Sequence, residues 1–325
     1  MRSRLRIFTW HVHGNYLYYL SQLPHEFYVP WAPGQAPGYA GARGSLPWGI
    51  NVHEVTVEQA RKLTLDCVLT QSRRNYLRDR QEILSRKQLA LPLVHLEHDP
   101  PLEHPSNTRH FVQDARALLV HVTPYNALMY DNGVTPVRVI EHGVALPRAA
   151  AWRGDLPRGL VVVNNLKTRG RRLGLDVYEA VRRHVPLDLV GMDAQTVGGL
   201  GEVANAELPA LMARYRFLFN PIRYTSLGLA VIEAMMVGLP VVGLATTELA
   251  TVVRNEREGF LANDLASLIA TMHRLLREPE TAAAWGAAAR KRALARFNLE
   301  RFSADWQAAL ATVVDLRQTG RARRG

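Results

Sequence analysis

Short apolar runs alternate with helical periods along the first half of the chain. They predict strands at residues 5–10, 25–29, 66–71, 91–96, 117–122 and 137–141. Helical or turn-rich sequence separates these runs, a pattern typical of an open α/β domain. A Pro- and Gly-rich stretch at 31–49 interrupts the alternation. It is too irregular for a regular element and long enough to predict a functional loop.

The second half repeats the alternation. It predicts strands at 160–164, 187–190, 217–219 and 241–245, and helices at 175–184, at 207–215 and around Glu233. The pattern lapses at 145–159, so we predict a first domain of residues 1–150 and a second of residues 151–325. Helices predicted at 265–277, 280–296 and 300–316 follow the last strand and cannot extend the sheet. They must pack on the flank of the second domain or cross back to the first. Two α/β halves predict a cleft between them, the usual place for a ligand.

Composition limits the classes of protein. A chain of 325 residues that is 47% hydrophobic is large enough for two packed cores. One cysteine, Cys67, lies in an apolar run, which excludes a disulfide framework and favours a small core residue in a reducing compartment. The first residues are interrupted by Arg and His, unlike a signal peptide, and no run approaches the roughly 20 apolar residues of a membrane span. We therefore expect a soluble, cytoplasmic protein.

The net charge of +11 raises the question of an anionic partner. Basic residues cluster at 73–87, 167–172 and 317–325, but no zinc spacing, helix-turn-helix or aromatic RNA-binding pattern accompanies them. The histidines His95, His98 and His104 also lack the spacing of a zinc site. Solvated faces are the simpler interpretation of the clusters, and we expect neither nucleic acid nor a metal.

Residues 216–247 form the most informative stretch. A buried strand, a polar Gly-containing turn, an amphipathic helix around Glu233 and a second buried strand make one βαβ unit. Parallel sheets bind ligands at the carboxyl ends of their strands. The amides at 225–228 would face a phosphate placed there. Glu233 is a carboxylate in an otherwise apolar helix, and a simple surface charge is the alternative interpretation.

These residues carry a resemblance to a known family. The segment NPIRYTSLGLAVIEAMMVGLPVVG, followed by Glu248-Leu249-Ala250, Glu258-Gly259-Phe260 and FNLERFSADW, resembles the carboxyl-terminal domain of GT-B glycosyltransferases of the family 4 type. In the first half, HLEHDPP, VTPYNALMYDNGVTPVRVIEHGV and VGM occur in the order that the family shows. The resemblance implies two Rossmann-like α/β domains facing a central cleft, with C-terminal helices crossing back to the first domain.

The same resemblance implies an activity. The first domain would bind the acceptor and the second the donor nucleotide. The enzyme would be a retaining, hexosyltransferase-type transferase that moves a sugar from a nucleotide-diphospho-sugar to a glycan, lipid-linked or small-molecule hydroxyl acceptor, as in polysaccharide biosynthesis. It would need neither a metal nor an organic cofactor. The departing phosphate oxygen would help to take the acceptor's proton, so no protein nucleophile would be required.

Glu233 matches the second glutamate of the family's paired-glutamate motif, which accepts hydrogen bonds from the ribose hydroxyls. Thr225 stands eight positions earlier, where the first glutamate is expected. Either Thr225 and Ser226 replace it as neutral hydrogen-bonding groups, or the donor sugar presents different chemistry, or the protein is inactive. The turn Leu227, Gly228 and Leu229 completes this part of the predicted donor site.

A basic pair after the first strand of the second domain binds the diphosphate in this family. Here the loop carries several cations, although the usual spacing of Arg and then Lys-Gly is not reproduced. Lys167 and Arg172 are our first choices, with Arg169 and Arg171 next and Asn165 beside them. Cations at a strand end suit the growing negative charge of a leaving diphosphate.

His98 matches the family's histidine near the donor sugar and the acceptor, and is predicted to be catalytic together with Thr225. Gly14 fits the glycine turn after the first strand, although an ordinary turn explains it as well. Alternative functions stay open: a non-catalytic or differently catalytic GT-B protein, such as a sugar-nucleotide epimerase, or a basic scaffold that binds membranes or nucleic acid. Residues 73–87 could also bring an enzyme to the anionic inner face of the membrane.

Overall fold

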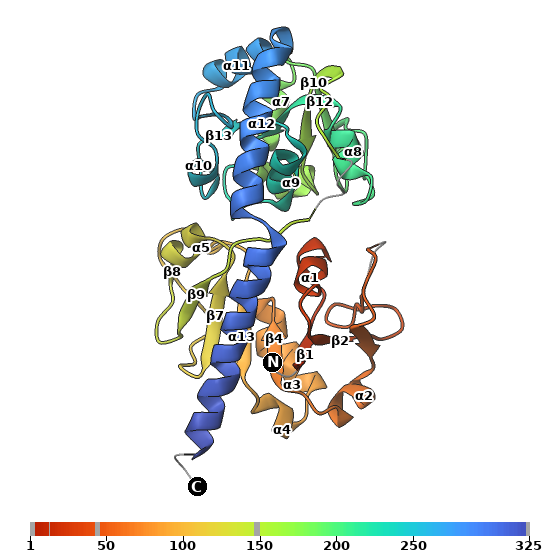
Figure 1. The fold of residues 1–325 in the computed structure, drawn as a ribbon, viewed down its shortest axis with the longest axis vertical. Coiled ribbons are helices and arrows are strands. Elements are labelled where there is room, and N and C mark those ends of the chain that lie inside the picture. The colour runs from red at the N-terminus through yellow and green to blue at the C-terminus, as the bar shows by residue number, and fades with distance from the viewer. Residues whose placement is uncertain (1–3, 13, 43–45, 146–149, 323–325) are drawn as a thin grey trace. The chain divides into compact units, whose positions relative to one another are not determined.

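A computed structural model describes residues 4–12, 14–42, 46–145 and 150–322 of the chain (Figure 1). The chain divides into two compact units. Unit 1 comprises Met1–Gly143 and Leu299–Gly325, and unit 2 comprises Val144–Asn298. The division falls before the boundary predicted at residue 150, and the last segment of the chain returns to unit 1.

Unit 1 contains a parallel sheet with the strand order β3-β2-β1-β4-β5-β7-β9. Its strands and the short pair β6-β8 have the bounds β1 (Arg6–Thr9), β2 (Glu26–Pro30), β3 (Val52–Val55), β4 (Cys67–Thr70), β5 (Leu93–Glu97), β6 (Thr108–Arg109), β7 (Ala117–His121), β8 (Tyr130–Asp131) and β9 (Val137–Val139). The short strand β3 was not predicted. Cys67 is fully buried in β4, where burial raises the pKa of its thiol to about 12, as expected for a core residue.

Some helices of unit 1 begin at side-chain caps that the sequence supplies. The helices of this unit are α1 (Gly14–Leu20), α2 (Val57–Lys62), η1 (Asn75–Asp79), α3 (Arg80–Ile83), α4 (Arg86–Leu89), α5 (Pro124–Met129) and α13 (Leu299–Ala322). Thr56 with Gln59 and Ser85 with Gln88 form capping boxes for α2 and α4. The basic segment 73–87 is helical over residues 73–83, with the π-helical turn η1 within it, and breaks before α4, for which Ser85 is the N-cap.

The final helix α13 is held in unit 1 by aromatic contacts. The Trp306 indole N–H donates to the Tyr16 hydroxyl at 3.1 Å, and the rings of Phe302 and Tyr16 lie 5.7 Å apart. Arg301 adds bonds to the backbone carbonyls of Glu141 and His142. These contacts confirm the predicted return of the C-terminal helices for α13 alone, since α11 and α12 belong to unit 2.

Unit 2 contains a second parallel sheet with the order β11-β10-β12-β13-β14. The bounds of its elements are β10 (Leu156–Val162), α6 (Leu166–Arg169), η2 (Gly170–Leu173), α7 (Leu175–Val181), β11 (Leu187–Val190), η3 (Ala194–Val197), α8 (Leu208–Met212), β12 (Tyr215–Asn220), α9 (Leu229–Val237), β13 (Val241–Leu244), α10 (Leu249–Val252), β14 (Gly259–Ala262), α11 (Leu265–Arg277) and α12 (Pro279–Arg296). The strand β10 begins inside residues 145–159, where the sequence pattern lapses. It was not recognised there because Pro157 and Gly159 interrupt the apolar run.

Helix α9 lies in the interior of unit 2. Every residue from Val231 to Val237 is buried, so the prediction of an amphipathic helix is wrong. The helix ends at Gly238, whose φ of +98° is a left-handed conformation that suits glycine. Helix α12 packs across it, and an added Cβ at Gly286 of α12 would lie 1.9 Å from the Gly238 carbonyl oxygen. The burial of α9 and the close contact between Gly238 and Gly286 thus fix its position.

No helix in the described part of the chain has an apolar stretch long enough to cross a membrane.

Candidate functional site

The sheet of unit 2 has a topological switch point between β10 and β12. From β10 the chain moves outward to β11, and from β12 it moves the other way to β13 and β14. Because the strands are parallel, the loops that follow β10 and β12 emerge at the same edge. Open α/β sheets bind ligands at this point. The predicted cations and the 225–228 turn lie on these two loops.

Hydrogen bonds tie the two loops together. The backbone N–H groups of Arg223 and Tyr224 donate to the Arg172 carbonyl at 3.1 and 3.2 Å. The Arg223 guanidinium donates to both carboxylate oxygens of Asp176, at 2.5 and 2.8 Å. Arg223 thereby holds the pKa of the Asp176 carboxyl below its ordinary value. Neither residue was predicted, since their roles depend on pairing across the two loops.

Gly174 allows this close approach. Its φ is +83°, and a Cβ at this position would lie 2.0 Å from the Pro221 carbonyl oxygen. Any larger residue would push the 170–173 turn away from the loop after β12. A glycine is therefore required where the two loops meet.

The predicted cations fall into two groups. Arg171 forms an ion pair with Asp176 at 2.6 Å and is already engaged. Among the described residues, Lys167, Arg169 and Arg172 form no ion pair; Lys167 and Arg169 are exposed on α6 and Arg172 is half-buried. These three cations remain available to an anion.

Asn165 shapes the start of this loop. It adopts a left-handed conformation, with φ of 55° and ψ of 40°, and its N–H donates to the Met192 carbonyl at 2.8 Å. The neighbouring Asn164 side chain accepts from the Met192 N–H at 2.9 Å. The loops after β10 and β11 are thereby joined, and Asn165 has a structural role in addition to the predicted one.

The N-terminus of α9 is open at the same edge. Gly228 is its N-cap, no side chain caps it, and nothing lies within 4 Å of a Cβ added there. Ser226 and Leu227 are buried, and Thr225, Gly228 and Leu229 are half-buried. Unsatisfied amides at a helix start attract anions.

Glu233 lies one turn further along α9 and is only 5% exposed. The alternative interpretation as a surface charge is therefore wrong. A buried carboxylate needs hydrogen-bond or ion-pair partners, and Glu233 lies on the helix whose N-terminus reaches the switch point.

Two other glutamates of the family-like pattern have structural partners in unit 2. Glu248 is 1% exposed and pairs with Arg296 at 3.0 Å. Glu258 is equally buried; Arg254 pairs with it and, against the effect of burial, holds the pKa of its carboxyl below the ordinary value. These ion pairs anchor the loops around β14 and α10.

In unit 1 the predicted residues lie at the ends of central strands. Gly14 begins α1 after β1, and His98 follows β5 directly with 8% exposure. The ring of His98 lies 4.9 Å from that of Tyr16 on α1, so the structure brings the helix that Gly14 starts against His98. A further residue, Gln71, is bonded to the imidazole of His98 at 3.1 Å and was not predicted.

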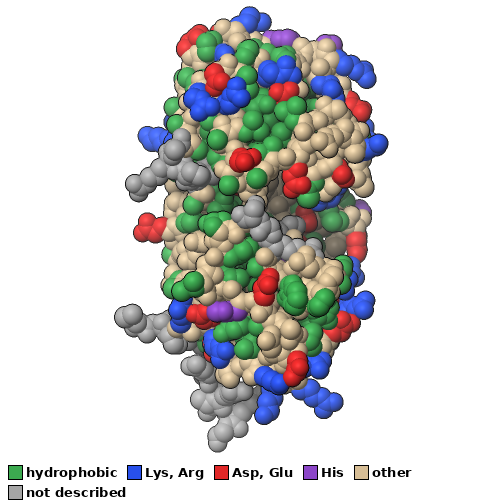
Figure 2. All heavy atoms as spheres, turned by 90° about the vertical axis from the view of Figure 1, so that its right-hand side faces the viewer, with side chains coloured by type: hydrophobic (Ala, Val, Ile, Leu, Met, Phe, Trp, Pro, Cys, Tyr) green, Lys and Arg blue, Asp and Glu red, His purple; other side chains and the backbone are tan. Residues whose placement is uncertain are grey.

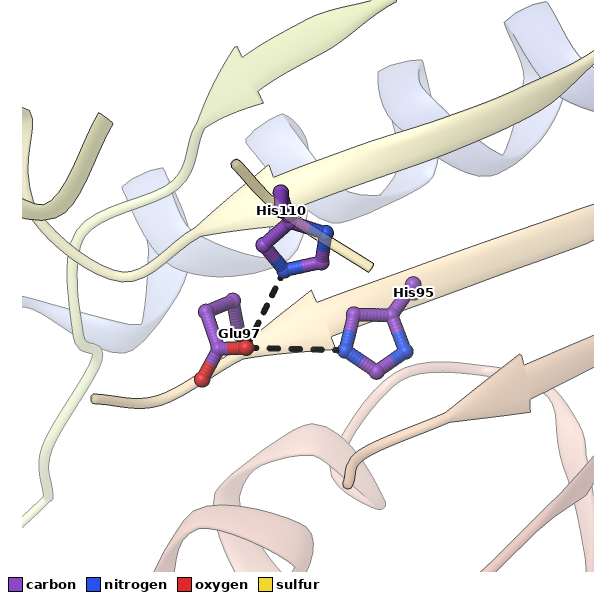
Figure 3. A group of neighbouring side chains, drawn as sticks. All are labelled: His95, Glu97 and His110. Atoms are coloured by element: carbon purple, nitrogen blue, oxygen red, sulfur yellow. Dashed lines mark hydrogen bonds and ion pairs between the residues drawn. The ribbon is translucent and has the colours of Figure 1, made fainter. Parts of the chain in front are cut away.

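A second histidine cluster lies behind this edge (Figure 3). His95, Glu97 and His110 place their side-chain ligand atoms within 4.8 Å of one another, a set of the composition that binds metals. Only His95 is shared with the histidines His95, His98 and His104, whose spacing in the sequence did not indicate a zinc site. Val112 donates its N–H to His110 Nδ1 at 3.1 Å, so Nε2 carries the proton and donates to Glu97 at 3.1 Å. This geometry favours a proton over a metal ion.

The carboxylate of Glu97 stays ionised within this cluster. Burial alone would raise the pKa of its carboxyl, but the hydrogen bond from His110 and the nearby His95 outweigh burial and hold that pKa well below its usual range. Burial lowers the pKa of the His95 imidazole, and lowers that of His121 to about 4. The cluster thus stabilises the sheet with largely neutral imidazoles around one carboxylate.

Three of the six cations in the basic segment 73–87 form ion pairs. Arg73 pairs with Glu103, Arg74 with Asp79, and Arg78 with Glu82. On the face that Figure 2 shows, Lys and Arg side chains are interspersed with Asp and Glu over both units. These pairs weaken the interpretation of this segment as a surface for nucleic acid or membrane.

Comparison with known proteins agrees with this architecture. Residues 162–278 match the family described as Glycosyl transferases group 1. No curated protein matches the sequence. Among solved structures, sucrose-phosphate synthase (tll1590) from Thermosynechococcus elongatus is 18% identical with a TM-score of 0.71, over 96% of this chain and 100% of that chain.

Two further structures match over nearly the whole length. A glycosyltransferase from Rickettsia africae is 13% identical with a TM-score of 0.69, over 96% of this chain and 99% of that chain. HepE (Alr3699) from Anabaena, in complex with UDP and glucose, is 13% identical with a TM-score of 0.67, over 95% of this chain and 100% of that chain. These matches show the GT-B fold of two Rossmann-like domains, and the family match lies inside unit 2. The chain therefore has the GT-B fold, and residues 162–278 of unit 2 match the family described as Glycosyl transferases group 1.

Proposed function

We propose that unit 2 binds a nucleotide-diphospho-sugar and that the enzyme transfers its sugar, with retention, to a hydroxyl acceptor bound by unit 1. The observation that carries the proposal is the switch point of unit 2. There, three cations without ion-pair partners in the described structure and the open N-terminus of α9 lie on two loops bound to each other. This edge combines the two features that hold a diphosphate in proteins, arginine or lysine charge and helix amides.

Lys167, Arg169 and Arg172 are the proposed diphosphate ligands, with the amides at Gly228 and Leu229. Arg171 is less suited than its neighbours because Asp176 already pairs with it. Glu233 would accept hydrogen bonds from the ribose hydroxyls, and Thr225 with Ser226 would face the donor sugar. HepE was solved with UDP-glucose, which makes uridine nucleotides the first probes for this chain.

The proposed reaction needs no protein nucleophile. The acceptor hydroxyl forms a bond to the anomeric carbon on the face from which the leaving group departs. The bond between this carbon and the phosphate oxygen breaks, and the nucleoside diphosphate leaves with the electron pair. The departing phosphate oxygen takes the hydroxyl proton, and the cations stabilise the charge that develops. We expect transfer to continue in EDTA. Inverted stereochemistry at the anomeric carbon of the product would overturn this mechanism.

The acceptor class, the family 4 type and any contact with a membrane are expectations from the sequence resemblance. A glycan, a lipid-linked sugar or a small-molecule hydroxyl would each suit the reaction. A cytoplasmic enzyme of polysaccharide biosynthesis is our working hypothesis, and acceptor screening with the donor that binds is the direct way to refine it.

Nucleotide titration by calorimetry tests the proposal, using UDP, GDP and ADP with the full chain. The variant Glu233→Gln should bind the preferred nucleotide about 10- to 100-fold more weakly, since a hydrogen bond to a charged group contributes about 1.5–3 kcal/mol. Its melting temperature should stay close to that of the parent protein. Glu179→Gln, which removes an exposed carboxylate from α7 of the same unit, is the matched control for the change of charge. Equal nucleotide affinities of Glu233→Gln and the parent protein would exclude the ribose role of Glu233. If the parent protein binds none of the three nucleotides, the proposed donor site is excluded.

A further inference from the structure

The sheet of unit 1 also has a topological switch point. Gln71, which the sequence analysis did not single out, lies next to it. The order β3-β2-β1-β4-β5 places β1 beside β4 and β4 beside β5. Trp10, Gln71 and His98 are the first residues after these strands. Because the strands are parallel, all three lie at one edge of the sheet.

The Gln71 side chain is held in one orientation. It is 3% exposed, and its Nε2 donates to the Trp10 carbonyl at 2.6 Å and to the Thr9 hydroxyl at 3.0 Å. A backbone carbonyl can only accept, so the amide nitrogen must face Trp10. The amide oxygen, Oε1, then faces His98 Nε2 at 3.1 Å.

The backbone of Gln71 is anchored as well. Its N–H donates to Asn75 Oδ1 at 3.4 Å, and Asn75 Nδ2 donates to Asp79 at 2.8 Å. Both residues belong to the π-helical turn η1, a rare element that often occurs at functional sites. Asp79 is fully buried and also pairs with Arg74. The π-helical turn and the ends of β1 and β4 together fix Gln71.

An amide oxygen accepts and cannot donate, so the nitrogen of His98 that faces it must carry a proton. In the neutral ring the lone pair is then on Nδ1. The ring is also held against Tyr16 at 4.9 Å, and Asn126 donates to the His98 carbonyl at 3.3 Å.

We propose that Gln71 is a positioning residue that fixes the Nε2–H tautomer of His98 and makes Nδ1 the hydrogen-bond acceptor for a substrate. This inference rests on the proposed function in assigning substrate binding to His98. A neutral acceptor nitrogen selects a group that donates, such as a sugar hydroxyl, and disfavours a carboxylate or phosphate oxygen that only accepts. The expected partner of Nδ1 is therefore a hydrogen-bond donor, for which the proposed function supplies a sugar or acceptor hydroxyl.

Nitrogen-15 NMR of the full chain labelled at histidine tests the tautomer without any substrate. The chain has 12 histidines, and the spectrum of His98→Asn identifies the signals of His98. In the parent protein near pH 8, Nε2 should give a protonated nitrogen signal and Nδ1 a lone-pair signal. In Gln71→Leu both signals should move toward the averaged values of a tautomer mixture. A protonated Nδ1 in the parent protein, or identical His98 shifts in Gln71→Leu, would overturn the proposal.

Gln71→Met provides a second variant in case Gln71→Leu does not fold, because it keeps the length of the side chain and removes both polar groups. The His98 signals should again move toward the averaged values of a tautomer mixture. Unchanged His98 signals would contradict the contact. Gln88→Leu is the matched control, because Gln88 is a buried glutamine of the same unit that donates to the Ala60 and Leu63 carbonyls at 2.8 and 2.9 Å. It should leave the His98 signals unchanged.

Kinetics test the link to the proposed function. Gln71→Leu should lower kcat about 10-fold or more, while the KM for the nucleotide-sugar changes little, because the donor nucleotide binds on unit 2. In a His98→Asn background the same change should have almost no further effect, since Gln71 acts through His98. Additive losses would contradict a positioning role. If nucleotide binding fails altogether, the proposed function is wrong, whereas the NMR result still decides the tautomer.

Discussion

At the carboxyl ends of neighbouring strands, unit 1 carries the buried pair Gln71 and His98, whereas unit 2 carries the exposed cations Lys167 and Arg169. His98 and Gln71 of unit 1 are 8% and 3% exposed and bonded to each other. Lys167 and Arg169 of unit 2 are exposed beside an open helix N-terminus. Both sheets are parallel and both have a switch point, so the fold alone does not select the ligand.

The difference indicates a division of chemistry. The attraction between cations and a diphosphate acts over a long range and changes little when the cations move. Exposed Lys and Arg side chains are therefore sufficient to bind a diphosphate in unit 2. A neutral hydroxyl is recognised only by the direction of a hydrogen bond, which requires a buried and fixed partner. The rigid network around His98 and the exposed cations of unit 2 are each suited to the ligand we propose for them.

We expect the largest effect from replacing two of the available cations of unit 2. Lys167→Ala combined with Arg172→Ala should weaken nucleoside diphosphate binding at least about 100-fold, because two charged contacts of about 1.5–3 kcal/mol each are lost. Binding to the parent protein should also weaken as salt concentration rises. Calorimetry at two salt concentrations measures both effects.

Arg171→Ala is the control for this prediction. Asp176 already engages Arg171, so its loss should change affinity only a few-fold. If Arg171→Ala weakens binding as much as the double variant, the division of the cations into engaged and available groups is wrong.

A second prediction separates the two loops of unit 2. Gly174→Ala should lower the free energy of unfolding by about 2–4 kcal/mol, from left-handed strain and from a clash with Pro221. Gly198→Ala is the matched control, since Gly198 has similar dihedral angles of 78° and 23°, but its nearest neighbour is the flexible Arg182 side chain at 3.3 Å. Urea unfolding should show the larger loss for Gly174→Ala. Equal losses would mean that the close approach to Pro221 contributes nothing.

The smallest predicted effect concerns the neutral imidazoles of unit 1. His121 is fully buried, and burial lowers its pKa to about 4. The unfolded chain binds this proton near its ordinary pKa of about 6.5, so the unfolded state binds more protons below that pH. Stability is fully present above about pH 6.5 and should fall by up to about 1.4 kcal/mol per pH unit as the pH drops toward 4.

Thermal unfolding between pH 8 and pH 4.5 measures this slope. In His121→Gln, which can still donate to the Asn132 side chain, the fall with decreasing pH should be shallower than in the parent protein. Identical slopes for His121→Gln and the parent protein would show that His121 does not take up a proton on unfolding. The contrast between neutral side chains in unit 1 and cations in unit 2 would then be weaker than we infer.

Much of the candidate site was predictable because it follows local pattern. The apolar runs around residues 217–219 and 241–245 predicted β12 and β13, and the intervening turn placed Thr225 to Gly228 at a strand end. The role proposed for Glu233 comes from the resemblance. Its burial was not predicted, because the sequence does not show that α12 packs against α9. Ser85 supplied a capping signal that the basic pattern of 73–87 concealed.

The residues that the sequence missed all act across strands. In the sequence, nothing distinguishes Gln71 from other polar residues. Its contacts exist because β1 and β5 place Trp10 and His98 beside it. Arg223 and Asp176 are 47 residues apart and meet only because β10 and β12 are neighbours. No local periodicity carries such information.

The sequence by itself determined that the chain alternates strands and helices in two halves, and it supplied the chemical groups at the strand ends. Only the tertiary structure decided where the units divide, since α13 joins unit 1 through Trp306 and Tyr16. It also decided which of the basic residues are engaged, and which nitrogen of His98 bears the proton. Hydrophobic periodicity is a local property of the chain, whereas pairing, burial and tautomer depend on neighbours that are distant in sequence.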